Sequence, residues 1–299
     1  MHHPLLLNGP LCIGGVLASI ASIASMGCSI SATPDGPDAA ESTASTATAV
    51  VVVERTTGPG DTVRADAVIA RFVRVHQGTV DDQALRIAGA AWDLPTVGTC
   101  STGAPQVRAA LQPRSVDLLD VGVLTLGDRE VGGDSKTEAK NTVLLPRTMF
   151  DPTDGVSGVI YSARSSESFT PSSRLQLRTT GGPDLPEGFL VNVTSPREVA
   201  DVRVGPASVS GALDIAWNVT DADDARDPVY VDVVSPSARL VARCTAVDQR
   251  HIVIPSASLG GLEEGQLSVH RLHRESFRSK GIEPGEIRFD VARVVTFRR

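Results

Sequence analysis

The sequence has few aromatic residues, few lysines and no excess of positive charge. Phe, Trp and Tyr make up 4% of the 299 residues, and only Lys136, Lys140 and Lys280 are lysines among 28 basic residues. The formal charge at pH 7 is −7. Nucleic-acid binding uses a basic surface, and broad base-stacking or sugar-stacking surfaces use many exposed rings. The composition therefore argues against a nucleic-acid partner and against a surface built from stacked rings.

An uncharged apolar run occupies residues 11–24. It is shorter than the roughly 20 residues of a permanent membrane-spanning helix, but it has the length of the apolar part of a signal peptide. Ser25-Met26-Gly27-Cys28 follows and resembles the lipobox of bacterial lipoproteins, although that family usually has Leu where Ser25 stands. The resemblance implies a signal peptide at residues 1–27, lipid attachment at Cys28 and, because Ser29 is not Asp, sorting to the outer membrane. Ordinary cleavage after Ser31 and an uncleaved anchor are the alternatives.

The next segment is predicted to be a disordered tether at residues 28–48. Residues 31–48 contain Ala, Ser, Thr, Pro, Gly and acidic residues, but no aromatic and no large aliphatic side chain. Such a segment cannot bury enough apolar surface to offset the entropy of ordering it. As a flexible coil it would reach roughly 25 Å, which is enough to hold a domain clear of lipid headgroups.

From residue 49 onward the dominant hydrophobic period is two. Apolar residues occupy every second position in segments such as Leu213–Trp217 and Ile287–Val291, with Gly-rich and Pro-rich turn signals between segments. This alternation is typical of antiparallel sheets with one buried face. It predicts an all-β fold with two β-sandwich domains, at residues 49–195 and 196–299. Residues 79–92 have some helical character, but Leu85-Arg86-Ile87 alternates, and we predict a strand there.

The C-terminal third resembles a fibronectin type III domain. Leu213-Asp214-Ile215-Ala216-Trp217 is similar to the second strand of that fold, which carries a core Trp. The other matching segments are Pro228–Val233 (third strand), Ile252–Pro255 (late strand), and Gln266–Leu272 with Glu286–Phe297 (final hairpin). Leu267 stands where the family has an aromatic, so the resemblance extends to immunoglobulin-like sandwiches in general. Residues 118–122 and 181–196 also resemble uncharacterised lipoproteins of high-GC Gram-negative bacteria, a group that implies a location but no activity.

Two cysteines, Cys100 and Cys244, lie beyond the N-terminal segment. They can form a disulfide in an oxidising compartment. Cys244 shares a strand face with Leu240 and Ala242, as a buried free thiol would. The two cysteines are also expected to belong to different domains. Two separate thiols are therefore the preferred interpretation, with a disulfide as the alternative.

One acidic loop places several carboxylates close together, and Ca²⁺ binds to clusters of such oxygen ligands. Its carboxylates are Asp221, Asp223, Asp224 and Asp227. The loop lacks the glycine and the bidentate Glu of an EF-hand, and Arg226 supplies a counter-charge. A solvated turn is the main interpretation, and a calcium site is the alternative.

No catalytic residue, cofactor or transition-metal site is predicted. His270 and His273 are three apart, and in a strand such residues point to opposite faces, so they cannot hold one ion. Segment 205–211 does not contain the Gly-x-Ser-x-Gly of a nucleophile elbow. We expect a non-catalytic cell-envelope lipoprotein that is attached to the membrane through its lipid and whose β-sandwich modules bind or scaffold an envelope protein or polysaccharide. The alternative is an extracytoplasmic enzyme, or an enzyme accessory domain, that acts on polysaccharide or peptide.

Overall fold

The structure is a computed structural model, and it describes residues 46–76, 78–103, 115–128, 141–151, 155–164, 171–205, 211–218, 227–247 and 250–299. The signal segment, Cys28 and the expected tether up to residue 45 lie outside the described residues. Everything from Ala44 to Arg299 falls into one compact unit. No helix in the described part of the chain has the length and apolar character needed to cross a membrane.

The prediction of an all-β fold is confirmed. The strands of the first half are β1 (Ala47–Thr57), β2 (Val63–Val75), β3 (Cys100–Thr102), β4 (Val116–Leu118), β5 (Leu124–Asp128), β6 (Asn141–Asp151), β7 (Val156–Arg164), β8 (Arg174–Thr179) and β9 (Phe189–Thr194). Those of the second half are β10 (Ala200–Val204), β11 (Leu213–Asn218), β12 (Val229–Val234), β13 (Leu240–Thr245), β14 (His251–Ile254), β15 (Glu264–Ser279) and β16 (Ile282–Arg298). The helical elements are α1 (Asp82–Ile87) and the short 3-10 turns η1 (Pro59–Asp61) and η3 (Ser256–Leu259).

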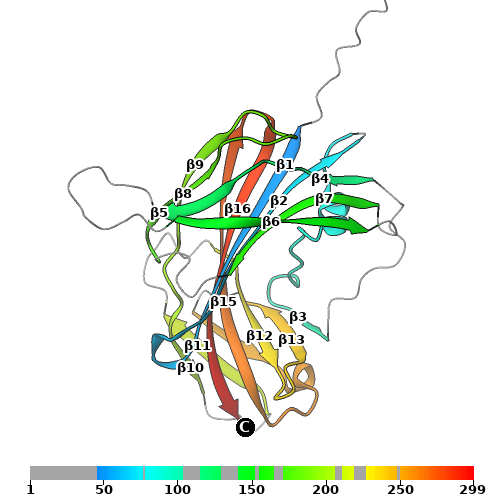
Figure 1. The fold of residues 1–299 in the computed structure, drawn as a ribbon. Coiled ribbons are helices and arrows are strands. Elements are labelled where there is room, and N and C mark those ends of the chain that lie inside the picture. Colours follow the sequence, from blue (N-terminus) through cyan, green and yellow to red (C-terminus); the bar gives the residue numbers. More distant parts are fainter. Residues whose placement is uncertain are drawn as a thin grey trace, which may run out of the picture. The chain divides into compact units, whose positions relative to one another are not determined.

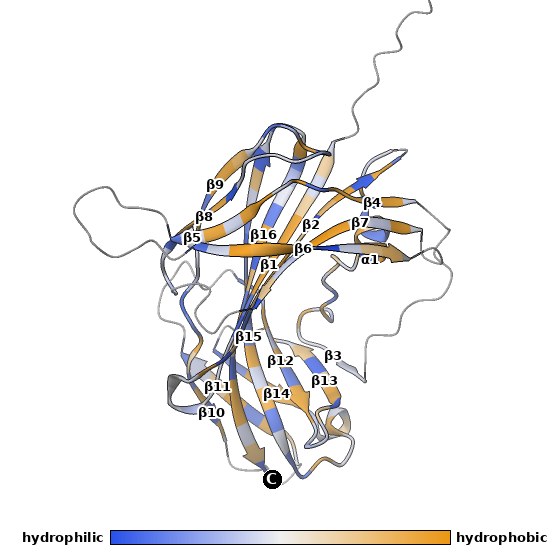
Figure 2. Ribbon diagram, in the orientation of Figure 1, coloured by the Kyte–Doolittle hydropathy of each residue, from blue (hydrophilic) through white to orange (hydrophobic). Residues whose placement is uncertain are grey.

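Thirteen strands form one sheet, in the order β3-β13-β12-β15-β16-β1-β2-β4-β7-β6-β5-β8-β9. The first strand of the chain, β1, lies parallel to the last, β16, and antiparallel to β2 (Figure 1). Hydrophobic and hydrophilic residues alternate along many of the strands (Figure 2), which leaves one face of each strand apolar. One core contains Phe72, Tyr161, Phe189 and Phe289. It is enclosed by the apolar faces of β1, β2, β5, β7, β8 and β9 and by the ends of β15 and β16 next to the turn that joins them.

A second sheet, β10-β11-β14, makes a sandwich with the other end of the large sheet. Leu213, Ile215 and Trp217 of β11 are buried in one core with Val231 of β12 and Val269 of β15. The two layers are β10-β11-β14 and β13-β12-β15-β16, which is the strand arrangement of immunoglobulin-like sandwiches. The segments matched to a fibronectin type III domain therefore form strands.

The hairpin of β15 and β16 belongs to both cores. Its two strands pair from Glu264↔Arg298 to Ser279↔Ile282, so they run through the sandwich and on into the larger core. Between the cores, buried ion pairs replace apolar contacts. Arg55 binds Asp66 at 2.8 Å, and Arg271 binds Asp227 at 3.0 Å. We call these four residues the waist layer. The large sheet thus continues across the domain boundary expected at residue 196.

The prediction of a strand at residues 79–92 is wrong, because helix α1 lies there. The Asp81 side chain caps the helix by accepting a hydrogen bond from the Ala84 amide at 2.9 Å. Ala84 and Ala88 pack on the outer face of β1 and β2, against Val50 and Val73. The apparent alternation at Leu85 and Ile87 reflects two partly buried residues of a short amphipathic helix.

Candidate functional site

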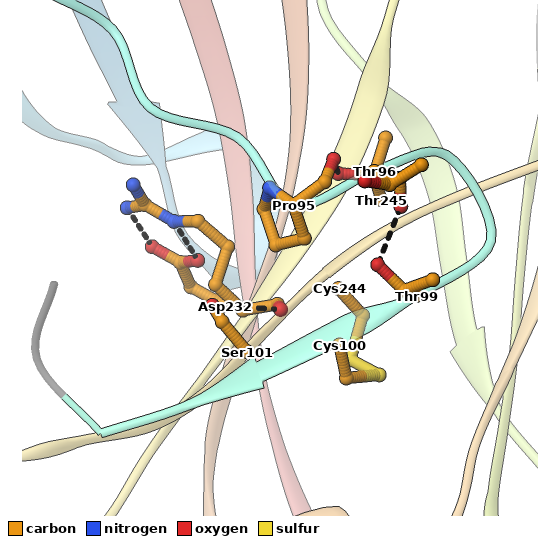
Figure 3. Close-up of a disulfide and its surroundings, with 9 residues drawn as sticks. Pro95, Thr96, Thr99, Cys100, Ser101, Asp232, Cys244 and Thr245 are labelled. Carbon is orange, nitrogen blue, oxygen red and sulfur yellow. Dashed lines mark hydrogen bonds and ion pairs between the residues drawn. A yellow bond between two sulfur atoms is a disulfide. The ribbon is translucent and has the colours of Figure 1, made fainter.

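Cys100 and Cys244 are joined by a disulfide (Figure 3). The two residues lie directly opposite each other on β3 and β13, with their Cα atoms 4.0 Å apart and their sulfurs 2.06 Å apart. This differs from the preferred interpretation of two separate thiols in two domains. The reason is that β3, from the N-terminal half of the chain, adds to the sandwich sheet beside β13.

The segment that leads into β3 is fastened to the end of β13. The Gly98 amide donates to the Thr245 carbonyl at 2.9 Å, and the Thr245 hydroxyl donates to the Pro95 carbonyl at 2.9 Å. The Thr99 hydroxyl donates to the Thr96 carbonyl at 2.7 Å. Gly98 has a φ of +80°, and a Cβ there would lie 2.8 Å from Val247. Together with the disulfide, these contacts hold the segment in one position (Figure 3).

A pocket of about 380 Å³ lies next to the disulfide, and we call it the disulfide pocket. Its walls are residues 98–100, Thr245, Val247, residues 251–253, Pro255 and Ser258. No Asp, Glu, Lys, Arg, Phe, Trp or Tyr is among these residues, and His251 is the one titratable side chain. The volume is within the range of small-ligand sites. The disulfide pocket can therefore take an uncharged group, which it would contact through valine methyls and through threonine and serine hydroxyls.

Two exposed valines line this pocket, and a third precedes one of its lining residues in the chain. Val247 and Val253 line it and are 75% and 50% exposed, and Val97, which precedes Gly98, is 62% exposed. Isolated exposed valines are ordinary on protein surfaces, but a group of them beside a hollow marks a contact surface. Sequence reasoning missed this site because its walls come from segments about 150 residues apart. The one local feature that pointed to a contact surface is Val247, an apolar residue just after the buried strand β13.

A buried polar network lies on the outer face of the sheet, where β12, β15 and β16 adjoin. His270 contacts Asp290 through Nδ1 at 3.0 Å and the Ser268 hydroxyl through Nε2 at 2.8 Å. The Tyr230 hydroxyl donates to Asp290 at 2.9 Å, and the Tyr230 ring stacks on His270 with 4.3 Å between centroids. Trp92 approaches the Tyr230 ring edge-on. Sequence reasoning did not identify this network.

Electrostatics favour the charged form of His270. Burial is the largest single influence on the pKa of His270 and lowers it. The charge and hydrogen bond of Asp290, together with the charge of Asp232, outweigh burial, so the pKa is raised. Burial first, and the charge of Asp290 second, raise the pKa of the neighbouring Glu54. A charged imidazole donates from both nitrogens, so His270 donates to Asp290 and to the Ser268 oxygen. In that state it cannot take a proton from Ser268.

Residues next to the network fasten segment 78–99, which we call the covering segment, to the sheet. Arg288 donates from Nη1 to the Ala90 carbonyl at 2.8 Å. Arg243 binds Asp232 through two hydrogen bonds of 2.7 Å and lies over the Tyr230 ring. The network therefore supports the covering segment, and the covering segment continues into one wall of the disulfide pocket.

The acidic loop proposed for calcium is described only at its last carboxylate. Asp221, Asp223 and Asp224 lie outside the described residues. Asp227 is buried and accepts hydrogen bonds from Arg271 at 3.0 Å and His273 at 3.0 Å. Its oxygens are therefore already bound within the waist layer and to His273. Among the residues that the structure describes, no group of three or more His, Cys, Asp or Glu could hold a metal ion.

The two histidines of β15 contact different carboxylates on opposite faces of the strand. His270 contacts Asp290, and His273 contacts Asp227. The hydrogen bond to Asp227 is the largest influence on the pKa of His273 and raises it, whereas burial lowers it by less.

Comparison with known proteins adds no identity to this geometry. No protein-family model matches the sequence, and no curated protein is found to be similar to it.

Proposed function

We propose that the chain is a non-catalytic, lipid-anchored envelope protein that binds a partner at the disulfide pocket. The observation that carries the proposal is the pocket itself, a hollow of about 380 Å³ with exposed valines around it and with one wall fixed by a disulfide. A preformed wall lowers the entropy lost on binding. The disulfide also suits an oxidising, extracytoplasmic compartment, as the lipobox resemblance implies.

The lining restricts the class of ligand. Apart from His251, which is paired with Asp214, no acidic or basic side chain lines the pocket, so it offers little to phosphate or carboxylate groups. With no Phe, Trp or Tyr, it lacks the platform on which sugars stack. An uncharged ligand with apolar groups fits this lining better than a polysaccharide does.

N-acetylvalinamide is a minimal probe for the proposed site. With the isotope-labelled full chain, NMR titration should shift resonances of residues 98–100 and 251–253. Ser258→Trp, which fills the pocket, should abolish these shifts. Ser256→Trp is the matched control, because Ser256 begins η3 but does not line the pocket. Shifts that are absent, or that are unchanged in Ser258→Trp, would contradict the proposal.

Lipid attachment is tested separately from binding. If Cys28 is acylated, Cys28→Ser should move the protein from the detergent-extracted membrane fraction to the soluble fraction. Mass spectrometry of the mature N-terminus should show the lipid mass in the parent protein only. An unchanged membrane fraction with no lipid mass would remove the anchor from the proposal and leave the pocket in place.

One observation favours a second candidate function, that of a hydrolase. Ser268, His270 and Asp290 have the contacts of a nucleophile, a base and its orienting carboxylate. Two features argue against it. The raised pKa of His270 favours its charged form, which cannot accept a proton. The backbone of β15 pairs with β12 on one side and β16 on the other, so the N–H groups of β15 beside Ser268 are already used in the sheet. A fluorophosphonate probe that labels the parent protein but not Ser268→Ala would support the hydrolase instead.

A further inference from the structure

The disulfide pocket lies between two strands that have a free edge. β3 is the terminal strand of the large sheet and β14 is the terminal strand of the small one, among the elements that the structure describes. η3 follows β14, and its Ser258 forms part of the pocket wall. The pocket therefore lies beside the free edge of each sheet of the sandwich, where backbone groups as well as side chains can be reached.

The free edge of β14 presents backbone hydrogen-bonding groups at strand spacing. In the β11–β14 ladder the Trp217 amide donates to the Arg250 carbonyl, and Ile215 lies opposite Ile252. Because antiparallel ladders alternate, Ile252 directs its N–H and C=O toward β11. His251 and Val253 therefore direct theirs away from the sheet. Both residues line the disulfide pocket.

These groups match the requirements of an added strand. A peptide that pairs with a sheet edge gains main-chain hydrogen bonds from alternate residues and places alternate side chains in pockets. Here the donors and acceptors come from His251 and Val253, and the side-chain pocket is beside them. Its lining carries no Asp, Glu, Lys or Arg, so the side chains that enter it should be uncharged and apolar.

We infer that the disulfide pocket binds an extended, uncharged peptide segment of a partner protein, which adds as a strand to the free edge of β14 with an apolar side chain in the pocket. This inference rests on the proposed function and names its ligand class. The length of β14, four residues, sets the length of the paired segment. The disulfide fixes the facing wall on β3, so the pocket can receive the side chain without rearrangement of that wall.

The test uses the blocked pentapeptide acetyl-Ser-Val-Thr-Val-Ser-amide and two N-methylated forms of it. One form is methylated on both Val nitrogens, and the other on the Ser and Thr nitrogens. In a strand, alternate amides point to opposite sides, so pairing with one edge uses only one of these two sets. We expect one methylated form to bind the full chain at least about fivefold more weakly than the parent peptide, and the other to bind equally. Equal binding of both forms, or loss of both, would overturn pairing with a single edge.

A variant of the protein tests the same hydrogen bond from the other side. Val253→Pro removes the outward N–H and leaves the β11–β14 ladder intact, because Val253 does not use its N–H there. It should weaken the pentapeptide at least about fivefold, while Val253→Thr, which keeps the N–H and the branched side chain, should not. Equal binding by Val253→Pro and Val253→Thr would also overturn the inference. If Val253→Pro fails to fold, the peptide series on the unaltered protein still decides the question.

N-acetylvalinamide separates this inference from the proposed function. It fills the pocket with one side chain and is too short to form a ladder with β14. If it binds as proposed but methylation of the pentapeptide has no effect, strand addition is wrong and the pocket remains a binding site. If neither probe binds, both proposals fail.

Discussion

At the scale of single residues, the structure holds charges in places where a β-sandwich usually has apolar contacts. His270 and His273 sit three apart on β15 and face opposite sides, each against a carboxylate from another strand. His270 is surrounded by Asp290 of β16, Tyr230 and Asp232 of β12, and Arg243 of β13. Carboxylates dominate this set, so the charged imidazole is stabilised in the fold.

These contacts predict the direction of the pH dependence of stability. The pKa of both histidines is raised above the ordinary value of 6.5 in the folded protein. A raised pKa means that the folded state binds the proton more tightly than the unfolded state does. The stabilisation is therefore complete below pH 6.5 and is lost as pH rises through the folded pKa. The raised pKa of Glu54 acts in the same direction, from its ordinary value of 4.5 upward.

Thermal melting between pH 6 and pH 8 tests this expectation. We expect the melting temperature of the parent protein to fall by a few degrees over this range. The double variant His270→Gln/His273→Gln should be less stable at pH 6 and should show a smaller fall. His76→Gln is the control, because His76 directly follows β2 and its side chain is 65% exposed. A melting temperature that rises with pH would contradict the assignment.

Alternation within a single strand predicts which of its residues are buried. Leu213, Ile215 and Trp217 were expected on one buried face of a strand, and they are 2%, 0% and 4% exposed. The polar network could not be predicted in this way. Asp290 is 20 residues from His270 and 60 residues from Tyr230, so only the pairing of β12, β15 and β16 brings the three together. In the sequence, buried polar residues of these strands occupy the same alternate positions as solvent-exposed ones, so the pattern does not distinguish the two.

At the scale of elements, short segments account for the differences between expectation and structure. β3 has three residues, too few for a period of two to be visible, and its partner β13 lies far along the chain. α1 has six residues and is set by the cap at Asp81, a local signal that competes with the alternation of Leu85 and Ile87. The long strands β15 and β16, with 16 and 17 residues, were expected from their pattern over residues 266–272 and 286–297.

The disulfide should determine the stability of β3 and of the covering segment. It closes a loop of 144 residues, so it restricts the unfolded chain strongly. Cys100→Ser/Cys244→Ser should lower the free energy of unfolding by about 2–5 kcal/mol, measured by urea denaturation. Limited proteolysis should also cut the double variant faster between residues 93 and 99.

Reduction supplies the control for the disulfide. A reductant should shift the parent protein to the denaturation midpoint of Cys100→Ser/Cys244→Ser, and it should leave the double variant unchanged. If the double variant unfolds at the same urea concentration as the oxidised parent, the bond does not stabilise the native state.

At the scale of the whole molecule, the sheet joins two cores that the sequence suggested were separate domains. Contiguous domains at residues 49–195 and 196–299 would each contain their own strands. Instead β1 pairs with β16, β3 pairs with β13, and the β15–β16 hairpin lines both cores. The period of two predicts strands but not their partners, so this connection could not be predicted from the pattern. A second connection comes from Arg55 of β1, which binds Glu198 just ahead of β10 at 2.5 Å.

The shared hairpin and the waist layer predict that both cores unfold as one unit. Trp217→Ala removes a buried aromatic from the sandwich core and should cost about 3–5 kcal/mol. If the cores are coupled, the most protected amides of β2, which lies in the other core, should lose as much protection against hydrogen exchange as those of β11. Trp217→Phe is the control. The Trp217 indole nitrogen has no hydrogen-bond partner in the described part of the chain, so Phe loses area but no hydrogen bond. Hydrogen exchange followed by mass spectrometry measures both strands in one experiment. Loss of protection confined to β11, with β2 unchanged in Trp217→Ala, would mean that the sandwich opens alone and that the hairpin frays at the waist layer.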